Sequence, residues 1–169
     1  MQNLEFKTRL DDPAKTAAVL TALRATDAGL LVQRDTYFRV ADGRLKLREM
    51  PDHAELIAYN RDERDGAMLS HYTVTPVADP AALRAELAAR HGIRGVVEKT
   101  RGLWLYRNAR IHLDHIAGLG SFLEIEVVEP RTLEDGRARL EELLTALRLH
   151  HAEPLRMSYV DLVEAAAPR

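Results

Sequence analysis

The sequence predicts an α+β fold in which antiparallel strands close into a barrel with helices on its outside. Three observations support this fold: charged residues recur every second position in five strand-like stretches, apolar residues alternate with them, and two Asp-Pro dipeptides open amphipathic helices. Since successive side chains of a strand point to opposite faces, each stretch has one charged and one apolar face. Helices can cover the apolar faces from outside, which leaves the charged faces to line the interior.

The charged alternation runs through residues 5–7, 46–48, 99–101, 110–114 and 124–126. A single stretch of this kind is typical of a sheet face exposed to solvent, and that alternative stays open for each stretch taken alone. Five stretches with the same pattern favour a shared charged lumen. Same-sign charges two positions apart repel unless an opposite charge lies between them. We therefore expect a mixed lumen, basic with a few carboxylates, suited to a polyanion and its metal ions.

The strands are expected at residues 3–10, 32–40, 44–50, 54–61, 67–76, 94–101, 103–108, 109–116 and 121–129. The glycine-containing segments 41–43 and 62–66 are typical of hairpin turns between neighbouring strands. Residues 158–163 are expected to form a short element that plugs or braces the barrel.

Three helices are expected outside the barrel. Asp12 and Asp79 each stand before a proline, so each aspartate can cap a helix whose first position tolerates proline. We expect the first helix to end before Gly29 and the second to end at Gly92, because glycine is common just past a helix. Leucines at helical spacing predict the third helix over residues 132–149.

Length and composition favour one globular domain over residues 1–169, with 46% hydrophobic and 30% charged residues. The absence of cysteine excludes disulfides, thiolate catalysis and zinc-thiolate sites, and fits a reducing cytoplasm. Neither a secretion signal nor an apolar run of membrane-spanning length is evident, so we expect a cytoplasmic protein. A net charge of −2 gives no reason to expect nucleic acid or a membrane as partner, and the oligomeric state is not readable.

The opening stretch Asn3-Leu4-Glu5-Phe6-Lys7 resembles the Glu-x-Glu-x-Lys signature of CYTH domains, the triphosphate tunnel metalloenzymes that include class IV adenylate cyclases, thiamine triphosphatases and inorganic tripolyphosphatases. Further stretches resemble family blocks in family order, at residues 35–38, 43–49, 59–61, 98–101, 112–114, 118–126 and 159–162. The resemblance covers the whole chain. It implies an eight-stranded antiparallel tunnel wrapped by helices.

The resemblance implies an enzyme that acts on a triphosphate with Mg²⁺ or Mn²⁺. Cations would clamp the phosphate oxygens, and the expected substrate-binding residues are Lys7, Lys46, Arg48, Arg61, Lys99, Arg101 and Arg110. Four of them would also stabilise charge in the transition state as catalytic groups, namely Lys7, Arg48, Lys99 and Arg101. Hard cations prefer carboxylate oxygens, and the expected metal ligands are Glu5, Glu124, Glu126 and Asp114.

Two residues leave alternatives open. Asp114 could instead orient a basic neighbour such as Arg110, and His112 could act as an acid or base or only as a hydrogen-bond partner. Asn3 replaces the first acidic residue of the signature, so it offers a carbonyl oxygen but no charge to a metal.

Three activities are compatible with this lumen. Hydrolysis of inorganic tripolyphosphate or of a nucleoside or thiamine triphosphate needs only a clamp, a metal and a water, and we favour it. Cyclisation of ATP to cyclic AMP and pyrophosphate also needs an aligned ribose hydroxyl. A module that binds polyphosphate or a nucleotide without turnover is the third possibility, which the Asn3 departure supports. An apolar carrier barrel conflicts with the expected charges.

Overall fold

The computed structural model describes residues 2–64 and 67–167, and the side chains of residues 61–67 lie outside that description. Within this part of the chain, eight strands and four helices follow one another in the order β1 (Gln2–Arg9), α1 (Pro13–Ala22), β2 (Thr26–Phe38), β3 (Arg44–Glu49), β4 (Ala54–Arg64), β5 (Ala67–Val77), α2 (Pro80–His91), β6 (Ile93–Tyr106), β7 (Ala109–Ile116), β8 (Gly120–Val128), α3 (Leu133–Ala146) and α4 (Tyr159–Ala166). All strand pairs are antiparallel, and the ring closes in the order β1-β5-β4-β3-β2-β6-β7-β8. The predicted α+β barrel with flanking helices is confirmed.

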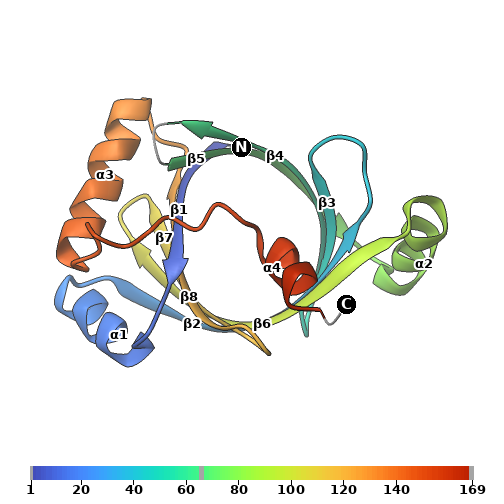
Figure 1. Cartoon of the computed structure of the whole chain (residues 1–169), viewed down its shortest axis with the longest axis horizontal. Coiled ribbons are helices and arrows are strands. Elements are labelled where there is room, and N and C mark those ends of the chain that lie inside the picture. The colour runs from blue at the N-terminus through green and yellow to red at the C-terminus, as the bar shows by residue number, and fades with distance from the viewer. Residues whose placement is uncertain (1, 65–66, 168–169) are drawn as a thin grey trace.

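The helices cover opposite sides of the barrel wall. Figure 1 looks into the barrel, with α1 and α3 against one side and α2 against the other. Leu4 of β1 packs in one buried cluster with Leu20 of α1 and Leu140 of α3. Leu47 of β3 packs with Leu87 of α2 in another. The apolar alternation therefore faces the helices, and the charged alternation faces the lumen rather than bulk water.

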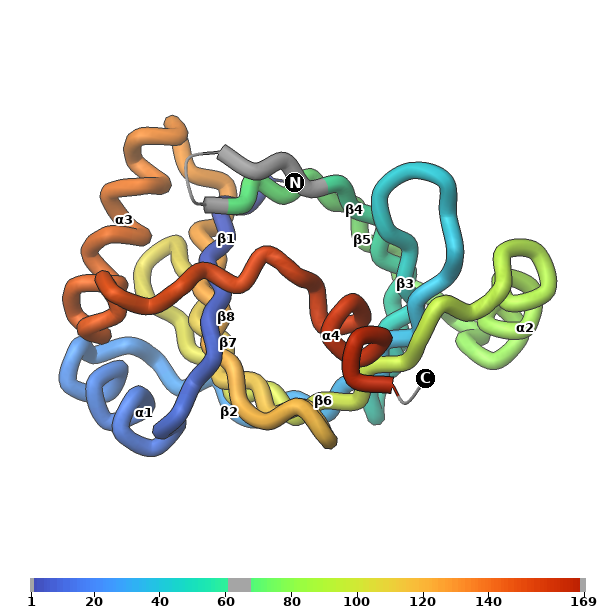
Figure 2. Tube along the Cα trace, in the orientation of Figure 1, coloured from blue at the N-terminus to red at the C-terminus, as the bar shows by residue number. Residues whose placement is uncertain are grey.

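The C-terminal segment closes over the barrel interior. The chain between α3 and α4 crosses the barrel opening (Figure 2), and the Leu155 N–H donates to the Lys7 carbonyl of β1 at 2.7 Å. Ser158 then caps α4 with a reciprocal side-chain and backbone box. Tyr159, the first residue of α4, is buried and lines the lumen cavity. The expected bracing role of residues 158–163 is confirmed.

The first helix is shorter than predicted, because it ends at Ala22 and not before Gly29. Arg24 adopts a left-handed φ of 59°, and the N–H groups of Arg24 and Ala25 donate to carbonyls of the last helical turn at 2.9 and 3.0 Å. Glycine usually occupies this left-handed position, and because arginine occupies it here, the helix end carries no glycine by which it could be recognised. Gly29 instead lies within β2, with a φ of 93°, where the pairing with β6 shifts register.

Other boundaries also differ from the predictions. The two strands predicted at residues 94–101 and 103–108 form one strand, β6, which runs from Ile93 to Tyr106, because Gly102 keeps its place in the ladder opposite Leu113. Strand β2 begins at Thr26, and β4 extends to Arg64 into the expected turn, whose residues 65–66 lie outside the described chain. The third helix ends at Ala146. None of the helices in the described residues has the length and apolar character needed to cross a membrane.

Candidate active site in the barrel lumen

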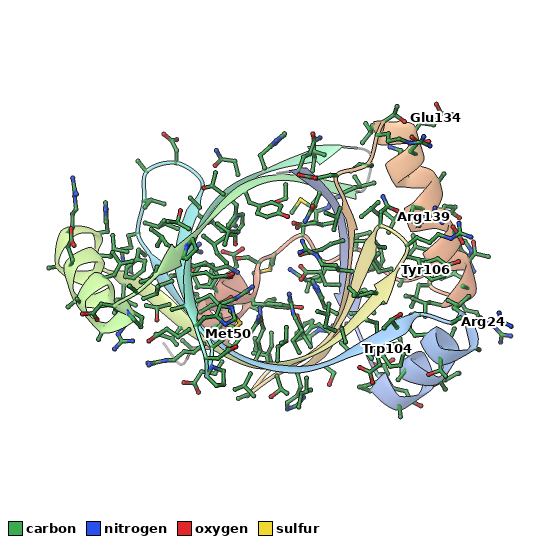
Figure 3. All side chains as sticks on the ribbon, turned by 180° about the vertical axis from the view of Figure 1, so that it is seen from behind. Arg24, Met50, Trp104, Tyr106, Glu134 and Arg139 are labelled. Carbon is green, nitrogen blue, oxygen red and sulfur yellow. The ribbon has the colours of Figure 1, made fainter. Side chains whose placement is uncertain are left out.

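The barrel encloses a cavity of about 390 Å³, within the size range of small-molecule sites. Figure 3 shows side chains projecting from the strands into the ring, while the labelled Trp104 and Tyr106 lie outside it beside the helices. Nine of the residues proposed from the sequence line this cavity together: Glu5, Lys7, Lys46, Arg48, Lys99, Arg101, Arg110, Glu124 and Glu126. Asp114 is hydrogen-bonded to Arg101, which lines the cavity. The Arg61 side chain lies outside the described part of the structure.

Asp35 of β2 gathers three cations on one side of the lumen. Its carboxylate accepts two hydrogen bonds from the Arg48 guanidinium, at 2.8 and 2.7 Å. It also accepts one from the Lys46 ammonium at 2.9 Å and one from the Lys99 ammonium at 3.4 Å. Strand register explains this convergence, since Asp35 is paired with Arg48 on β3 and Lys99 lies two positions along the adjoining strand β6. One buried anion thus holds three positive groups in place.

Burial and charge set the protonation of this cluster. Burial alone would raise the pKa of Asp35, but its three cationic partners outweigh burial and hold the pKa well below its usual value. Burial and the neighbouring Arg48 lower the pKa of Lys46 to about 8. Burial and Arg101 lower the pKa of Lys99 well below its usual value. In the free protein, burial and the neighbouring arginines therefore favour the neutral amines of Lys46 and Lys99. A bound polyanion would favour their protonated, positively charged forms.

This balance predicts proton uptake when a triphosphate binds. A polyanion beside Lys46 favours the protonated ammonium and raises its pKa, so near pH 8 the complex binds more protons than the free protein. Calorimetric titration of tripolyphosphate at pH 8, in two buffers of different ionisation enthalpy, should show net proton uptake, and the share that Lys46 contributes should decline toward pH 6.5. Lys46→Met should reduce the number of protons taken up, leaving the uptake by Lys99. Equal uptake by the wild type and the variant would contradict the assignment.

Arg101 of β6 links two buried carboxylates of the lumen, Asp114 and Glu124. Its guanidinium donates twice to the Asp114 carboxylate, at 2.7 Å each, and once to Glu124 Oε2 at 2.9 Å. The Tyr159 hydroxyl also donates to Asp114, at 2.8 Å. Both oxygens of Asp114 are therefore engaged in orienting Arg101. The sequence left open whether Asp114 orients a basic neighbour such as Arg110. In the structure Asp114 orients a basic neighbour, and that neighbour is Arg101.

The carboxylates on β8 form a candidate cation site with a histidine. One ligand atom from each of His112, Glu124 and Glu126 lies within 4.8 Å of the others. The His112 Nδ1 is 3.3 Å from Glu124 Oε2 and 4.0 Å from Glu126 Oε1. Glu5 lies opposite Glu126 in the β1–β8 register and lines the same cavity. Three of the four residues proposed as metal ligands thus share one wall, and His112 joins them.

Neighbouring cations keep these carboxylates ionised. Burial would raise the pKa of Glu124, but Lys7 at 3.1 Å and Arg101 outweigh it and hold the pKa well below its usual value. Burial likewise opposes ionisation of Glu126, whose pKa is nevertheless lowered by His112 and by Arg110 at 2.9 Å. Burial and Arg101 lower the pKa of His112. The site thus presents anionic oxygens and an imidazole nitrogen, a donor set that fits Mg²⁺ or Mn²⁺.

Asn3 lies at the edge of this wall and is oriented by Arg110. In the amide orientation that satisfies both ends, its oxygen accepts from the Arg110 guanidinium at 3.1 Å and its nitrogen donates to the Gln2 carbonyl at 2.9 Å. The amide oxygen therefore faces a cation. The anionic part of the first-strand donor set rests on Glu5.

Sequence reasoning missed two residues that organise the lumen, Asp35 and Tyr159. Lys7 Nζ lies 4.3 Å from the Tyr159 ring centroid, and Lys99 Nζ lies 5.3 Å from it, so the ring contacts two of the proposed phosphate ligands. The alternation could have indicated Asp35, since it lies on the same face of β2 as Leu31 and Tyr37, which line the cavity. Residues 158–163 were expected to plug or brace the barrel, but no lumen role was assigned to Tyr159 itself.

Comparisons with known proteins agree with this architecture. The PH1012 protein of Pyrococcus horikoshii is 22% identical, with 95% of this chain and 98% of that chain covered and a TM-score of 0.85. A proposed adenylate cyclase of Vibrio parahaemolyticus is 14% identical over 96% and 97%, with a TM-score of 0.75. The proposed adenylyl cyclase HpAC1 of Hippeastrum, described as having a dominant triphosphatase activity, is 17% identical over 99% and 97%, with a TM-score of 0.70. At these identities the likeness shows the fold.

Among curated proteins, none matches the sequence of this chain. The model of the CYTH domain matches residues 1–159, almost the whole chain. The residues that it spans include all eight strands and the cation and carboxylate walls of the lumen. The chain therefore belongs to the CYTH family.

Proposed function

We propose that this chain is a divalent-metal-dependent enzyme that hydrolyses a triphosphate inside the barrel. One observation carries the proposal: among the described residues, six lysines and arginines and a carboxylate–histidine group line one cavity, and most of these side chains are buried. A triphosphate carries about four negative charges near neutral pH, and its transition state spreads negative charge over the transferred phosphoryl group. The substrate class comprises inorganic tripolyphosphate and nucleoside or thiamine triphosphates.

Glu5, Glu124 and Glu126, with His112 beside them, would hold Mg²⁺ or Mn²⁺. Such an ion, when bound, supplies positive charge to phosphate oxygens and orients an attacking water. The chain itself keeps the ligands anionic through Lys7 and Arg110, whose ammonium and guanidinium groups contact Glu124 and Glu126. Asp114 supports this site indirectly, because it fixes Arg101.

The cations would bind and orient the phosphate chain. Arg48 and Arg101 are each held by a buried aspartate, so their guanidinium groups are fixed before the substrate arrives. Lys46 and Lys99 add point charges beside them. Fixed positive groups on a wall of buried side chains stabilise developing charge more strongly than mobile groups in bulk water. Arg61 remains a proposed contact of this set.

Replacing Lys7 should weaken triphosphate binding. Lys7 is 6% exposed and faces the lumen, so Lys7→Ala removes one charge-assisted contact, equivalent to about 1.5 to 3 kcal/mol or roughly 10- to 150-fold in affinity. Lys15→Ala is the matched control, because Lys15 lies on the exposed side of α1. Calorimetry with tripolyphosphate measures both variants. Unchanged affinity in Lys7→Ala would refute the proposed clamp.

Product analysis tests hydrolysis against the two alternatives. The protein is incubated with ATP and Mn²⁺, and the products are separated by ion-exchange chromatography. We expect ADP and free phosphate without cyclic AMP. Cyclic AMP with pyrophosphate as main products would establish a cyclase instead, and tight binding without any product would establish a binding module. A cytoplasmic setting, consistent with a chain that has no cysteine, is part of the proposal.

A further inference from the structure

A second cavity lies outside the lumen, beside α4. Its volume is about 270 Å³, and among the described residues Tyr37 is the single one that lines both cavities. The second cavity forms where β2 ends and where β3 and β6 begin. Its other lining residues in the described chain are Phe38, Arg39, Val40, Gly43, Arg44 and Arg94. They include three arginines and no acidic residue, so the lining is strongly basic.

Two of these arginines hold α4, and one of them keeps an N–H group without an acceptor. Arg44 Nη2 donates to Asp161 at 3.0 Å, and Arg94 Nη2 donates to the same carboxylate at 2.6 Å. Arg94 also donates to both oxygens of Glu164, through Nε at 3.1 Å and through Nη2 at 2.6 Å. The Arg44 Nε atom is buried and donates to no residue that the structure describes. An unsatisfied buried donor costs free energy, which an acceptor in the cavity would recover.

Arg39 brings the third guanidinium group to the cavity. Its side chain is exposed and makes no ion pair or hydrogen bond with the described part of the chain. Its backbone N–H donates to the Gly92 carbonyl at 3.1 Å, which holds the end of β2 beside the start of β6. The three arginines of the cavity have two carboxylates as ion-pair partners, Asp161 and Glu164, so three minus two leaves one net positive charge. This surplus charge is available to an anion.

The free donors and the charge restrict the class of ligand. A guanidinium group binds oxyanions through its N–H donors, and phosphate is a preferred partner of arginine. The oxygens of a phosphate group point in several directions, so one anion can accept N–H groups from more than one arginine. Three arginines would repel a metal cation. The lining therefore suits a small anion of the phosphate class.

We propose that this cavity is a second anion site, separate from the lumen, which binds inorganic phosphate or pyrophosphate through Arg39, Arg44 and Arg94. The site goes beyond the proposed function, since none of these three arginines lines the lumen cavity. A bound anion shares Arg44 and Arg94 with the carboxylates of α4 and repels those carboxylates. Its affinity is therefore linked to the hold of these arginines on α4, the helix whose Tyr159 lines the lumen.

Nuclear magnetic resonance tests the proposal one site at a time, without metal or substrate. Phosphate and pyrophosphate are each titrated into the protein in EDTA at constant ionic strength. The backbone amide signals of Gly43 and Arg94 report the outer cavity, and that of Lys7 reports the lumen. We expect the outer signals to shift and to saturate, which gives a dissociation constant for the outer site alone.

Two variants should change that constant in opposite directions and leave the lumen constant unchanged. Arg39→Gln should raise it at least about threefold, because the change removes a cationic contact. Glu164→Gln should lower it about two- to fivefold, because the change removes a carboxylate that competes for Arg94. The anion with the smaller dissociation constant identifies which of the two the site prefers.

Arg131→Gln is the matched control, because Arg131 precedes α3, lines neither cavity and has a side chain that is 91% exposed. It should leave both constants unchanged. The outer site would be refuted by outer signals that do not shift, that shift equally with sodium chloride of the same ionic strength, or that titrate identically in Arg39→Gln and the wild type. A protein that hydrolyses no triphosphate, yet shows the expected shifts and variant effects, would refute the proposed function and retain the outer site.

Discussion

Glu126→Gln is expected to lower metal-dependent turnover by at least about 100-fold. The substitution removes an anionic ligand from the group formed with His112 and Glu124, and changes to residues that merely support metal ligands already cost about 10- to 100-fold. The Glu126 side chain is 14% exposed and retains a polar amide after the change, so the barrel should keep its fold. Steady-state phosphate release measured across a Mn²⁺ titration quantifies the loss.

Glu98→Gln is the matched control for this experiment. Glu98 lies next to Lys99 on β6 but on the outer face, where its side chain is 68% exposed and contacts Arg34. Its substitution should leave turnover and metal dependence unchanged. If Glu126→Gln had wild-type activity at every Mn²⁺ concentration, the assignment of Glu126 as a metal ligand would be wrong.

Arg101→Ala is expected to lower the free energy of unfolding by about 3 to 5 kcal/mol as well as to abolish turnover. Arg101 is the shared partner of two buried carboxylates, Asp114 and Glu124, and breaking a buried pair leaves charge without compensation. Among the residues that the structure describes, Glu124 keeps the Lys7 ammonium, whereas Asp114 keeps the Tyr159 hydroxyl and more distant charges. Urea unfolding followed by circular dichroism measures the change.

Arg48→Ala provides the contrast, because Asp35 still has Lys46 and Lys99 after the arginine is removed. Arg48→Ala should therefore impair triphosphate binding with a clearly smaller loss of stability than Arg101→Ala. Equal destabilisation by the two variants would contradict the view that Arg101 alone supports an otherwise poorly compensated carboxylate.

The direction of the lumen side chains was readable from the sequence, because a period of two fixes which residues share a face of a strand. That period placed Lys7, Lys99 and Glu124 on the lumen side correctly. It could not assign their partners, since partners depend on register between strands far apart in the chain. The pairing of Lys7 with Glu124 across β1 and β8 is of this kind.

Residues whose roles depend on tertiary placement escaped prediction for the same reason. Tyr159 belongs to a helix that reaches the lumen only after the chain has crossed the barrel opening. The end of α1 was misplaced because Arg24 takes the left-handed conformation that glycine usually adopts.

Metal-dependent phosphate release tests the central claim most directly. Wild-type protein, Lys7→Ala and Glu126→Gln are each assayed on ATP and on tripolyphosphate, with Mg²⁺, with Mn²⁺ and with EDTA. The lumen site described here predicts release by the wild type only when a divalent metal is present, and a large loss in both variants. Release that persists in EDTA, or that is the same in all three proteins, would show that the barrel lumen is not the site of a metal-dependent triphosphatase.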